Sequence, residues 1–316
     1  MSRRPDVLSR LDPEMLEALA KSEALHAEVA DALPADPIAA RRQDYEHERR
    51  YWNAEPVPIA SVEERTVEAA GLPTKLRFYR PEATEDPPAI LFLHGGGWVV
   101  GNLDTHDRVM RLLALHARTT VIGVDYALAP EAKFPTQIDQ AVAVVRHLGR
   151  PLVLAGDSAG AHLSLATALD LVGPQSPVRG LLLWYGAYGL SDGASRRLWG
   201  GPVDGLGPED LAFYRDAWLR GPEDRNDPRY DLLARDLAGL PPVWVGACAL
   251  DPLHDDSATL AGLLAAAQVS VESTTYEGVL HGFLHLSRTV PKAETAIRDG
   301  AAFLQRHLRP ESGRRS

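Results

Sequence analysis

Several features that mark secreted, membrane or nucleic-acid-binding proteins are missing from this sequence. Its single cysteine, Cys248, excludes a disulfide within the chain and lies in a run typical of a buried strand. No uninterrupted apolar run reaches the roughly 18–20 residues of a membrane span, and no apolar signal-peptide core accompanies the N-terminal arginines. A net charge of -10 argues against nucleic acid or an anionic membrane as a partner. We therefore expect a soluble, cytoplasmic protein. The sequence leaves its oligomeric state open, a homo-oligomer included.

Two parts of the chain differ in pattern, and a third stretch interrupts the second part. Residues 1–60 carry helical patterns broken by Pro34 and Pro37, without a strand pattern, so we expect an N-terminal helical segment. Residues 61–316 alternate between short apolar runs and amphipathic stretches, as in one large domain. Residues 187–240 break this alternation with Gly, Pro, Trp and charged residues. We interpret them as an insertion above a sheet.

The alternation predicts an α/β fold. Continuous apolar runs such as Ala89–Leu93 are typical of strands buried on both faces of a parallel sheet. We predict strands at residues 76–79, 89–93, 119–126, 151–155, 178–185, 243–250 and 271–276. We predict helices at residues 105–118, 137–148, 161–171, 208–219, 257–267 and 293–308. This spacing implies a mostly parallel sheet covered by helices on both faces.

The chain is organised around the stretch Gly156-Asp157-Ser158-Ala159-Gly160. It lies between a predicted strand and a predicted helix, which is the setting of a G-x-S-x-G nucleophile elbow. We expect glycine at both ends because the turn is too tight for side chains, which leaves Ser158 strained and exposed. Small residues cluster in many turns, so the motif is a weak signal by itself and its setting strengthens it.

A serine hydroxyl needs a base to act as a nucleophile, and the base needs a third group to orient it. The chain order Ser, Asp, His is expected for hydrolases of this alternating type. In open α/β sheets, functional side chains gather beyond the carboxyl ends of the strands. Asp251 directly follows the predicted strand 243–250, and His281 follows the strand 271–276 after a short loop. We therefore expect both to project from the same sheet edge as Ser158.

Neighbouring acidic and imidazole side chains offer alternatives. Asp255 and Asp256 precede a predicted helix, where their ordinary role is capping. His285 lies four residues beyond the expected base, but Gly282 stands where an H-E-x-x-H zinc motif has glutamate. We therefore expect His285 to be a structural histidine. His162, on the helix after the elbow, is expected to be a packing residue.

The run His94-Gly95-Gly96-Gly97-Trp98 directly follows the predicted strand Ala89–Leu93. Acyl transfer builds negative charge on a carbonyl oxygen, which aligned backbone N–H groups stabilise, and glycines let that backbone approach closely. An HGGG-type loop supplies one such donor, and the residue after the nucleophile, Ala159, supplies another. A phosphate-binding loop is the rival interpretation. The run lacks the Gly-Lys-Ser/Thr ending, however, and Val100 replaces the last glycine of G-x-G-x-x-G.

Together these motifs resemble those of the hormone-sensitive-lipase-like family of bacterial carboxylesterases, in its Gly-Asp-Ser-Ala-Gly branch. They are especially similar to those of the bacterial acetyl esterases within it. The segments that carry the resemblance are residues 94–98, 101–108, 126–131, 156–160, 183–186, 251–256 and 281–283. The resemblance implies an α/β-hydrolase fold with a helical cap, formed by residues 1–60 and 187–240.

The resemblance also implies roles for individual residues. Ser158 is the nucleophile, His281 the base, and Asp251 the group that orients the base. The implied oxyanion donors are the backbone amides of Gly96, Gly97 and Ala159. No metal or organic cofactor is implied. Ala127 departs from the family, which usually has arginine at this position, and it lies away from the catalytic positions.

We therefore expect a serine carboxylesterase whose small-molecule substrates are esters with acetyl to butyryl acyl groups. Bulky side chains at strand ends are expected to line the pocket and limit acyl length, namely Trp98, Trp184 and Tyr185. Further candidates in the insertion are Trp199, Tyr214 and Trp218. The same triad serves hydrolases of amides, peptides and longer lipids, and the fold also supports non-catalytic ligand-binding or regulatory proteins. These alternatives stay open at the level of the sequence.

Overall fold

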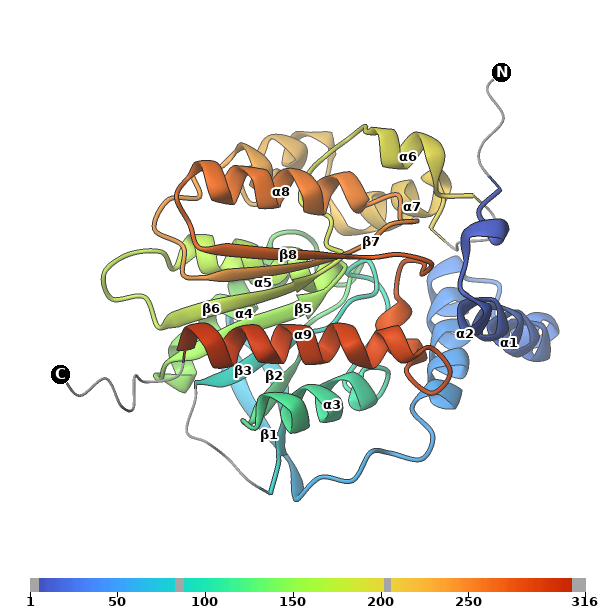
Figure 1. The fold of residues 1–316 in the computed structure, drawn as a ribbon, viewed down its shortest axis with the longest axis horizontal. Helices are drawn as coiled ribbons and strands as arrows, with labels where there is room; N and C mark the ends of the chain where they lie inside the picture. The colour runs from blue at the N-terminus through green and yellow to red at the C-terminus, as the bar shows by residue number, and fades with distance from the viewer. Residues whose placement is uncertain (1–5, 83–87, 202–205, 309–316) are drawn as a thin grey trace.

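The computed structural model describes residues 6–82, 88–201 and 206–308. Eight strands form one sheet in the order β1-β2-β4-β3-β5-β6-β7-β8 (Figure 1). β2 runs antiparallel to both of its neighbours, whereas the strands from β4 to β8 are parallel. The strands are β1 Ser61–Ala69, β2 Leu72–Arg80, β3 Ala89–Leu93, β4 Val121–Asp125, β5 Leu152–Asp157, β6 Val178–Trp184, β7 Val243–Cys248 and β8 Val271–Tyr276.

Helices alternate with the strands from β3 onward and also precede the sheet. The α-helices are α1 Pro13–Val29, α2 Pro37–Trp52, α3 Asp107–Ala117, α4 Thr136–Leu148, α5 Ala159–Asp170, α6 Ala194–Leu198, α7 Pro208–Trp218, α8 His254–Ala266 and α9 Pro291–Leu308. In the ranges that the structure describes, no helix combines the length and the apolar character needed to cross a membrane.

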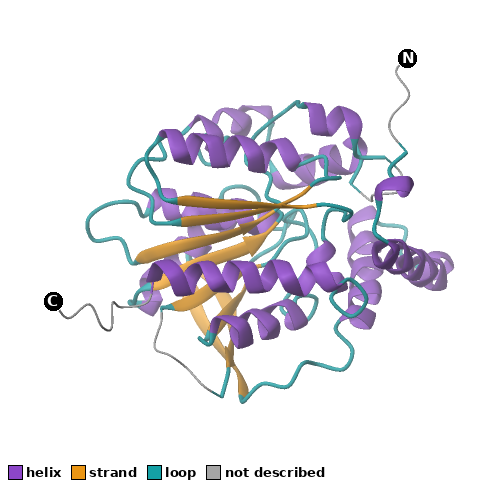
Figure 2. Ribbon diagram, viewed as in Figure 1, coloured by secondary structure: helices purple, strands orange, loops and turns teal. Residues whose placement is uncertain are grey.

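Two layers of helices enclose the sheet (Figure 2). α4, α5 and α8 cover one face, where Ile138, Leu163 and Leu260 join a common core with strand residues. α3 and α9 cover the opposite face, where Met110 and Phe303 belong to a second core. β3, β5 and β7 are buried along their whole length. Burial on both faces is the reason that these strands appear in the sequence as continuous apolar runs.

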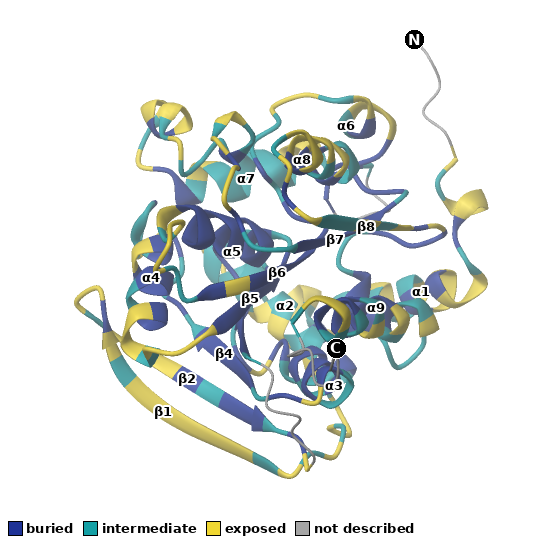
Figure 3. Cartoon of the chain, turned by 60° about the vertical axis from the view of Figure 1, so that its left-hand side comes forward, coloured by how far each residue is buried: buried dark blue, intermediate teal, exposed yellow. Residues whose placement is uncertain are grey.

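The predicted alternation is confirmed, with bounds that differ by a few residues for most elements, and the strand and α-helix that are not predicted lie at the exposed edge of the sheet and in the insertion. β3 and β8 have the predicted bounds, whereas β1 and the short helix α6 are not predicted. β1 is an edge strand whose residues 62–66 are exposed (Figure 3). Glu63, Glu64 and Arg65 follow one another there, so no apolar alternation marks the strand. Cross-strand ion pairs such as Arg77 with Glu64 accompany its pairing with β2.

The N-terminal helices and the insertion lie together at the carboxyl end of the parallel strands (Figure 1). α1 and α2 come from the N-terminal segment, and α6 and α7 come from the stretch between β6 and β7. Arg41 of α2 joins the two parts. Its Nη1 donates to Asp210 Oδ1 of α7 at 2.8 Å, and its guanidinium lies 4.5 Å from the ring centroid of Phe213. Two segments that are far apart in the sequence therefore form one cover over the strand ends.

Candidate active site

Three polar side chains from the ends of different strands form one hydrogen-bonded chain. Ser158 follows β5, Asp251 follows β7, and His281 lies in the loop after β8. His281 Nε2 is 2.9 Å from Ser158 Oγ, and His281 Nδ1 is 2.8 Å from Asp251 Oδ2. Asp251 is fully buried, and its other oxygen accepts the Leu253 N–H at 2.8 Å. Because an ionised carboxylate only accepts hydrogen bonds, Nδ1 carries the imidazole proton and Nε2 faces the serine as an acceptor.

Ser158 occupies a strained backbone conformation, with φ of 51° and ψ of -118°. Its N–H donates to the Trp184 carbonyl at 2.8 Å, which ties the turn to the neighbouring strand β6. Space explains the two glycines of the motif. A Cβ on Gly160 would lie 1.9 Å from Leu93 O, and a Cβ on Gly156 would lie 2.4 Å from Gly160. Larger side chains at these positions would push the elbow away from the end of β3.

The loop after β3 turns towards the same serine with positive φ at two glycines. Gly96 has a φ of 116° and Gly97 a φ of 58°, values that favour glycine. Tyr126 Oη donates to the His94 carbonyl at 2.7 Å and so holds the start of the loop. Within the described residues, the amides of Gly96, Gly97 and Ala159 donate to no backbone or side-chain acceptor. These three residues line the same cavity as the serine, so their amides are available to a negatively charged oxygen.

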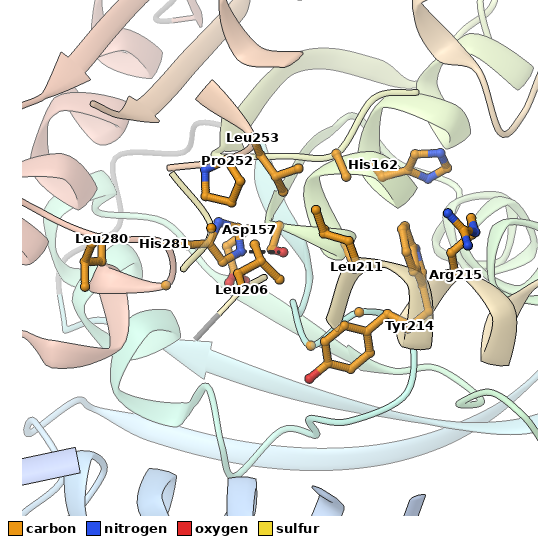
Figure 4. A pocket seen from close by; sticks show the side chains of 18 of the residues that line it. Asp157, His162, Leu206, Leu211, Tyr214, Arg215, Pro252, Leu253, Leu280 and His281 are labelled. Carbon is orange, nitrogen blue, oxygen red and sulfur yellow. Dashed lines mark hydrogen bonds between the residues drawn. The ribbon is translucent and has the colours of Figure 1, made fainter. Parts of the chain in front are cut away.

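Ser158 lies in the wall of a cavity of about 860 Å³. Figure 4 shows His281 and Leu280 at one end of this cavity and His162 and Tyr214 at the other, with Leu206 between them. The N-terminal helices α1 and α2, the insertion and the loops that follow the strands all contribute lining residues. The cavity therefore extends from the serine in two directions, one past the imidazole and one towards the insertion.

The expectation that Trp184 and Tyr185 line the pocket is wrong. Trp184 is fully buried, and its Nε1 donates to the Ala296 carbonyl of α9 at 3.3 Å. It is the last residue of β6 and points to the face that α9 covers. Tyr185 is also buried, and its ring lies edge-on to that of His281 with centroids 4.9 Å apart. It supports the imidazole from the core instead of facing the cavity.

The aromatic side chains around the cavity come from the loop after β3 and from the insertion. Trp98 lines the cavity and stacks on Trp218, with ring centroids 3.9 Å apart and an interplanar angle of 6°. Tyr214 lines the cavity directly above Gly97, where an added Cβ would lie 2.3 Å from the ring. Trp199 packs into the core on the α9 side. Among the insertion candidates, Tyr214 is thus the ring that faces the site, and Trp218 supports Trp98 from behind.

Asp255 and Asp256 do not cap α8, contrary to the expectation from the sequence. The helix begins at His254, so both carboxylates lie in its first turn. Asp255 Oδ2 accepts the Ser195 N–H at 2.9 Å, and Asp256 Oδ1 accepts the Tyr188 N–H at 2.8 Å. Their partners lie 60 and 68 residues away in the sequence, which is why local helix rules miss them. Both carboxylates tie the insertion to the main domain.

His162 and His285 are buried beside the site without joining the hydrogen-bonded chain. His162 Nε2 donates to the Tyr230 carbonyl at 3.2 Å, and its ring packs edge-on against Trp98 with centroids 5.5 Å apart. Burial lowers the pKa of His162 to about 4. Burial also lowers the pKa of His285 to about 3. Both side chains are therefore neutral at neutral pH. His162 packs against Trp98, whereas His285 Nε2 lies 3.6 Å from Asp157 Oδ2.

In the part of the chain that the structure describes, one group of three side chains has the composition of a metal site. It consists of His106, Asp157 and His285, whose ligand atoms lie within 4.8 Å of one another. Asp157 Oδ1 is 3.4 Å from His106 Nε2, and Oδ2 is 3.6 Å from His285 Nε2. Oδ1 also accepts the Gly95 N–H. Asp157 is thus the negatively charged member of the group, and one of its oxygens is already engaged by a backbone donor. The group is not visible in the sequence because its members come from three distant segments.

Solved proteins that are similar to this chain are named esterases or ester hydrolases. A family model described as alpha/beta hydrolase fold matches residues 90–285. A hyperthermophilic esterase from the archaeon Pyrobaculum calidifontis is 30% identical over 94% of this chain and 98% of its own, with a TM-score of 0.85. An ester hydrolase from the metagenome of Lake Arreo is 30% identical over 94% of this chain and 99% of its own, with a TM-score of 0.84. A thermostable carboxylesterase cloned from a metagenomic library is 30% identical over 87% of this chain and 99% of its own, with a TM-score of 0.83.

Acid should destabilise the protein through its buried histidines. The pKa of His94 and of His285 is lowered to about 3 and that of His162 to about 4, mainly by burial. An unfolded histidine takes up a proton near about pH 6.5. Each buried histidine therefore favours the folded state fully above that pH. As the pH falls towards 4, the free energy of unfolding decreases by about 1.4 kcal/mol per pH unit for each of these histidines. Urea unfolding at pH 7, 6 and 5 measures the slope of the free energy of unfolding against pH.

A matched pair of variants assigns part of the slope to one residue. The slope is proportional to the number of protons that the chain takes up on unfolding, and His162→Gln should lower this number by about one. The same change at the exposed His147 should leave the contribution of the buried histidines intact. An unchanged slope in His162→Gln would contradict the interpretation.

Proposed function

This chain belongs to the alpha/beta hydrolase fold family, and we propose that it is a serine carboxylesterase that hydrolyses short-chain acyl esters. The observation that carries the proposal is the unbroken contact from Asp251 to His281 to Ser158, at 2.8 and 2.9 Å. Solved relatives named as esterases and carboxylesterases support ester hydrolysis. Within the family we assign the chain to the hormone-sensitive-lipase-like carboxylesterases, because its HGGG loop and Gly-Asp-Ser-Ala-Gly elbow occur together.

Acylation begins with transfer of the Ser158 proton to His281 Nε2 as Oγ attacks the ester carbonyl. Asp251 accepts from Nδ1–H, which keeps the imidazole in the productive tautomer and stabilises its protonated form. His281 then gives the proton to the departing alcohol oxygen. The alcohol leaves and an acyl-enzyme on Ser158 Oγ remains. Water repeats the sequence with the same base and releases the carboxylic acid.

The oxyanion of each tetrahedral intermediate is stabilised by backbone donors. We assign this role to the amides of Gly96, Gly97 and Ala159, because they surround the serine without competing acceptors among the described residues. Such preorganised donors favour the transition state because the charge develops only there. Removal of a single donor of this kind typically costs about 10²–10³ in kcat.

The direction of proton transfer distinguishes the two ends of the cavity. His281 must reach the alcohol oxygen, so the alcohol group lies on the imidazole side, near Leu280. The acyl group then points towards the other end, where Figure 4 shows Tyr214 and His162 and where Trp98 packs against His162. There the stacked tryptophans and the ring above Gly97 close the space that a long acyl chain needs. This arrangement favours acetyl to butyryl groups.

Hydrolysis of 4-nitrophenyl esters from C2 to C12, assayed below micellar concentrations, tests the proposed function. We expect the highest kcat/KM at C2–C4 and a steep fall beyond C6–C8, because each further methylene meets the aromatic wall instead of gaining about 0.8 kcal/mol by burial. Ser158→Ala should lose on the order of 10⁴ in turnover while it still folds. Wild-type protein without ester hydrolysis, or a maximum at C10 or above, would contradict the proposal.

Tyr214 provides a separate test of the acyl end. Tyr214→Ala should raise kcat/KM for the octanoyl ester relative to the acetyl ester by about tenfold or more, since several methylenes gain space for burial. Tyr214→Phe keeps the ring, loses only the hydroxyl that lies 3.4 Å from Arg41 Nη1, and should retain the short-chain preference. A chain-length profile in Tyr214→Ala that matches the wild type would place the acyl group elsewhere.

The role of Asp251 can be separated from that of Asp255. Asp251→Asn disturbs the imidazole tautomer and should reduce kcat by up to about 10⁴-fold. Asp255→Asn keeps an acceptor for Ser195 and should retain turnover, with a loss of at most about 1 kcal/mol in the free energy of unfolding. Turnover and urea unfolding of the two variants provide the comparison. An inactive Asp255→Asn beside an active Asp251→Asn would reverse the assignment.

A further inference from the structure

Asp157 is a buried carboxylate next to the nucleophile that takes no part in the proton transfer. It is the last residue of β5, and its side chain is 3% exposed. Oδ1 accepts the Gly95 N–H at 2.9 Å, and Oδ2 lies 3.4 Å from Tyr185 Oη. It is among the residues that line the cavity drawn in Figure 4. A carboxylate in such a place has a high desolvation cost, so its surroundings must compensate for it.

The surroundings keep this carboxylate ionised. Burial by itself would raise the pKa of Asp157, but the imidazoles of His106 and His285 hold it well below its usual range. The two rings lie 3.4 and 3.6 Å from the two carboxylate oxygens. Asp157 therefore offers the Gly95 amide a charged acceptor, and charge-assisted hydrogen bonds are shorter and stronger than neutral ones.

Both backbone groups of Gly95 are hydrogen-bonded, one to the end of β5 and one to the neighbouring residue His94. Its N–H donates to Asp157, and its carbonyl accepts from His94 Nδ1 at 2.9 Å. The fit leaves no space, since a Cβ on Gly95 would lie 2.5 Å from Asp157 Oδ2. Gly95 directly precedes Gly96, and Asp157 directly precedes Ser158. One hydrogen bond therefore connects the residue before the oxyanion glycines to the residue before the nucleophile.

We propose that Asp157 is a positioning residue that sets the distance between Ser158 Oγ and the oxyanion amides of Gly96 and Gly97. This inference rests on the proposed function. The spacing affects the transition state more than the bound ester, because only the transition state carries the negative charge on oxygen. A displacement of the loop should therefore lower kcat and leave KM nearly unchanged. Misplacement by about 1 Å can cost about 10² in rate.

Three variants test the proposal by steady-state kinetics on an acetyl ester. Asp157→Ala removes the acceptor and should lower kcat about 10²-fold, with KM within about threefold of the wild type. Asp157→Asn keeps an acceptor oxygen without the charge and should recover most of kcat, to within about tenfold. Gly95→Ala disturbs the same contact from the loop side and should resemble Asp157→Ala. The rate of covalent reaction with a 4-nitrophenyl phosphonate should fall in parallel, because that reaction also places charge on an oxygen at the amides.

Thermal unfolding accompanies each assay and distinguishes positioning from a merely structural role. If Asp157→Ala folds and keeps kcat within threefold of the wild type, the proposal is wrong. If Asp157→Ala does not fold, Gly95→Ala decides, and an unchanged kcat there refutes the proposal. A rise in KM at constant kcat in either variant also contradicts it. Wild-type protein that neither hydrolyses the ester nor reacts with the phosphonate at Ser158 would instead contradict the proposed function itself.

Discussion

The site depends on the close approach of the first turn of α5 to the carboxyl end of β3. Only a hydrogen atom fits between Gly160 and the Leu93 carbonyl, since a Cβ would lie 1.9 Å from that oxygen. The contact brings the elbow of Ser158 against the loop that carries Gly96 and Gly97. The strained φ of 51° at Ser158 persists because packing on both sides holds the turn. The proposed nucleophile and the proposed oxyanion donors are thus parts of one packed unit and not of separate loops.

The cover over the strand ends is held by polar contacts that link distant segments. Arg41 connects α2 to α7, and the carboxylates at the start of α8 hold the backbone of the insertion. Asp256 is fully buried and also pairs with Arg196 at 2.6 Å. Loss of one member of such a buried pair leaves an uncompensated charge, which typically costs about 3–5 kcal/mol. These contacts hold Tyr214 above Gly97, so the shape of the proposed acyl end depends on both helical segments.

Much of this architecture is visible in the sequence because burial leaves a simple pattern. Strands covered on both faces appear as apolar runs, and the helices between them have an amphipathic period. The positions of Asp251 and His281 follow from one rule, that functional side chains gather beyond the carboxyl ends of parallel strands. The edge strand β1 is not detected because solvent covers its residues 62–66, where charged and apolar side chains are both tolerated.

The alternating α/β fold, the elbow, the glycine loop and the order Ser158, Asp251, His281 can all be read from the amino-acid sequence. These are local patterns or consequences of strand direction. Which aromatic residues face the cavity and which acidic residues hold the insertion depends on contacts between distant segments, which the sequence pattern does not contain. Trp184 is the last residue of β6, a strand that is buried on both faces of the sheet. The continuous apolar run of this strand therefore does not indicate on which face of the sheet the Trp184 side chain lies. In the sequence, Asp157 is simply the second residue of the Gly-Asp-Ser-Ala-Gly motif. Its charge is buried, and burial of a charge requires several compensating groups at once. These groups come from residues 95, 106, 185 and 285, which meet only when the chain folds.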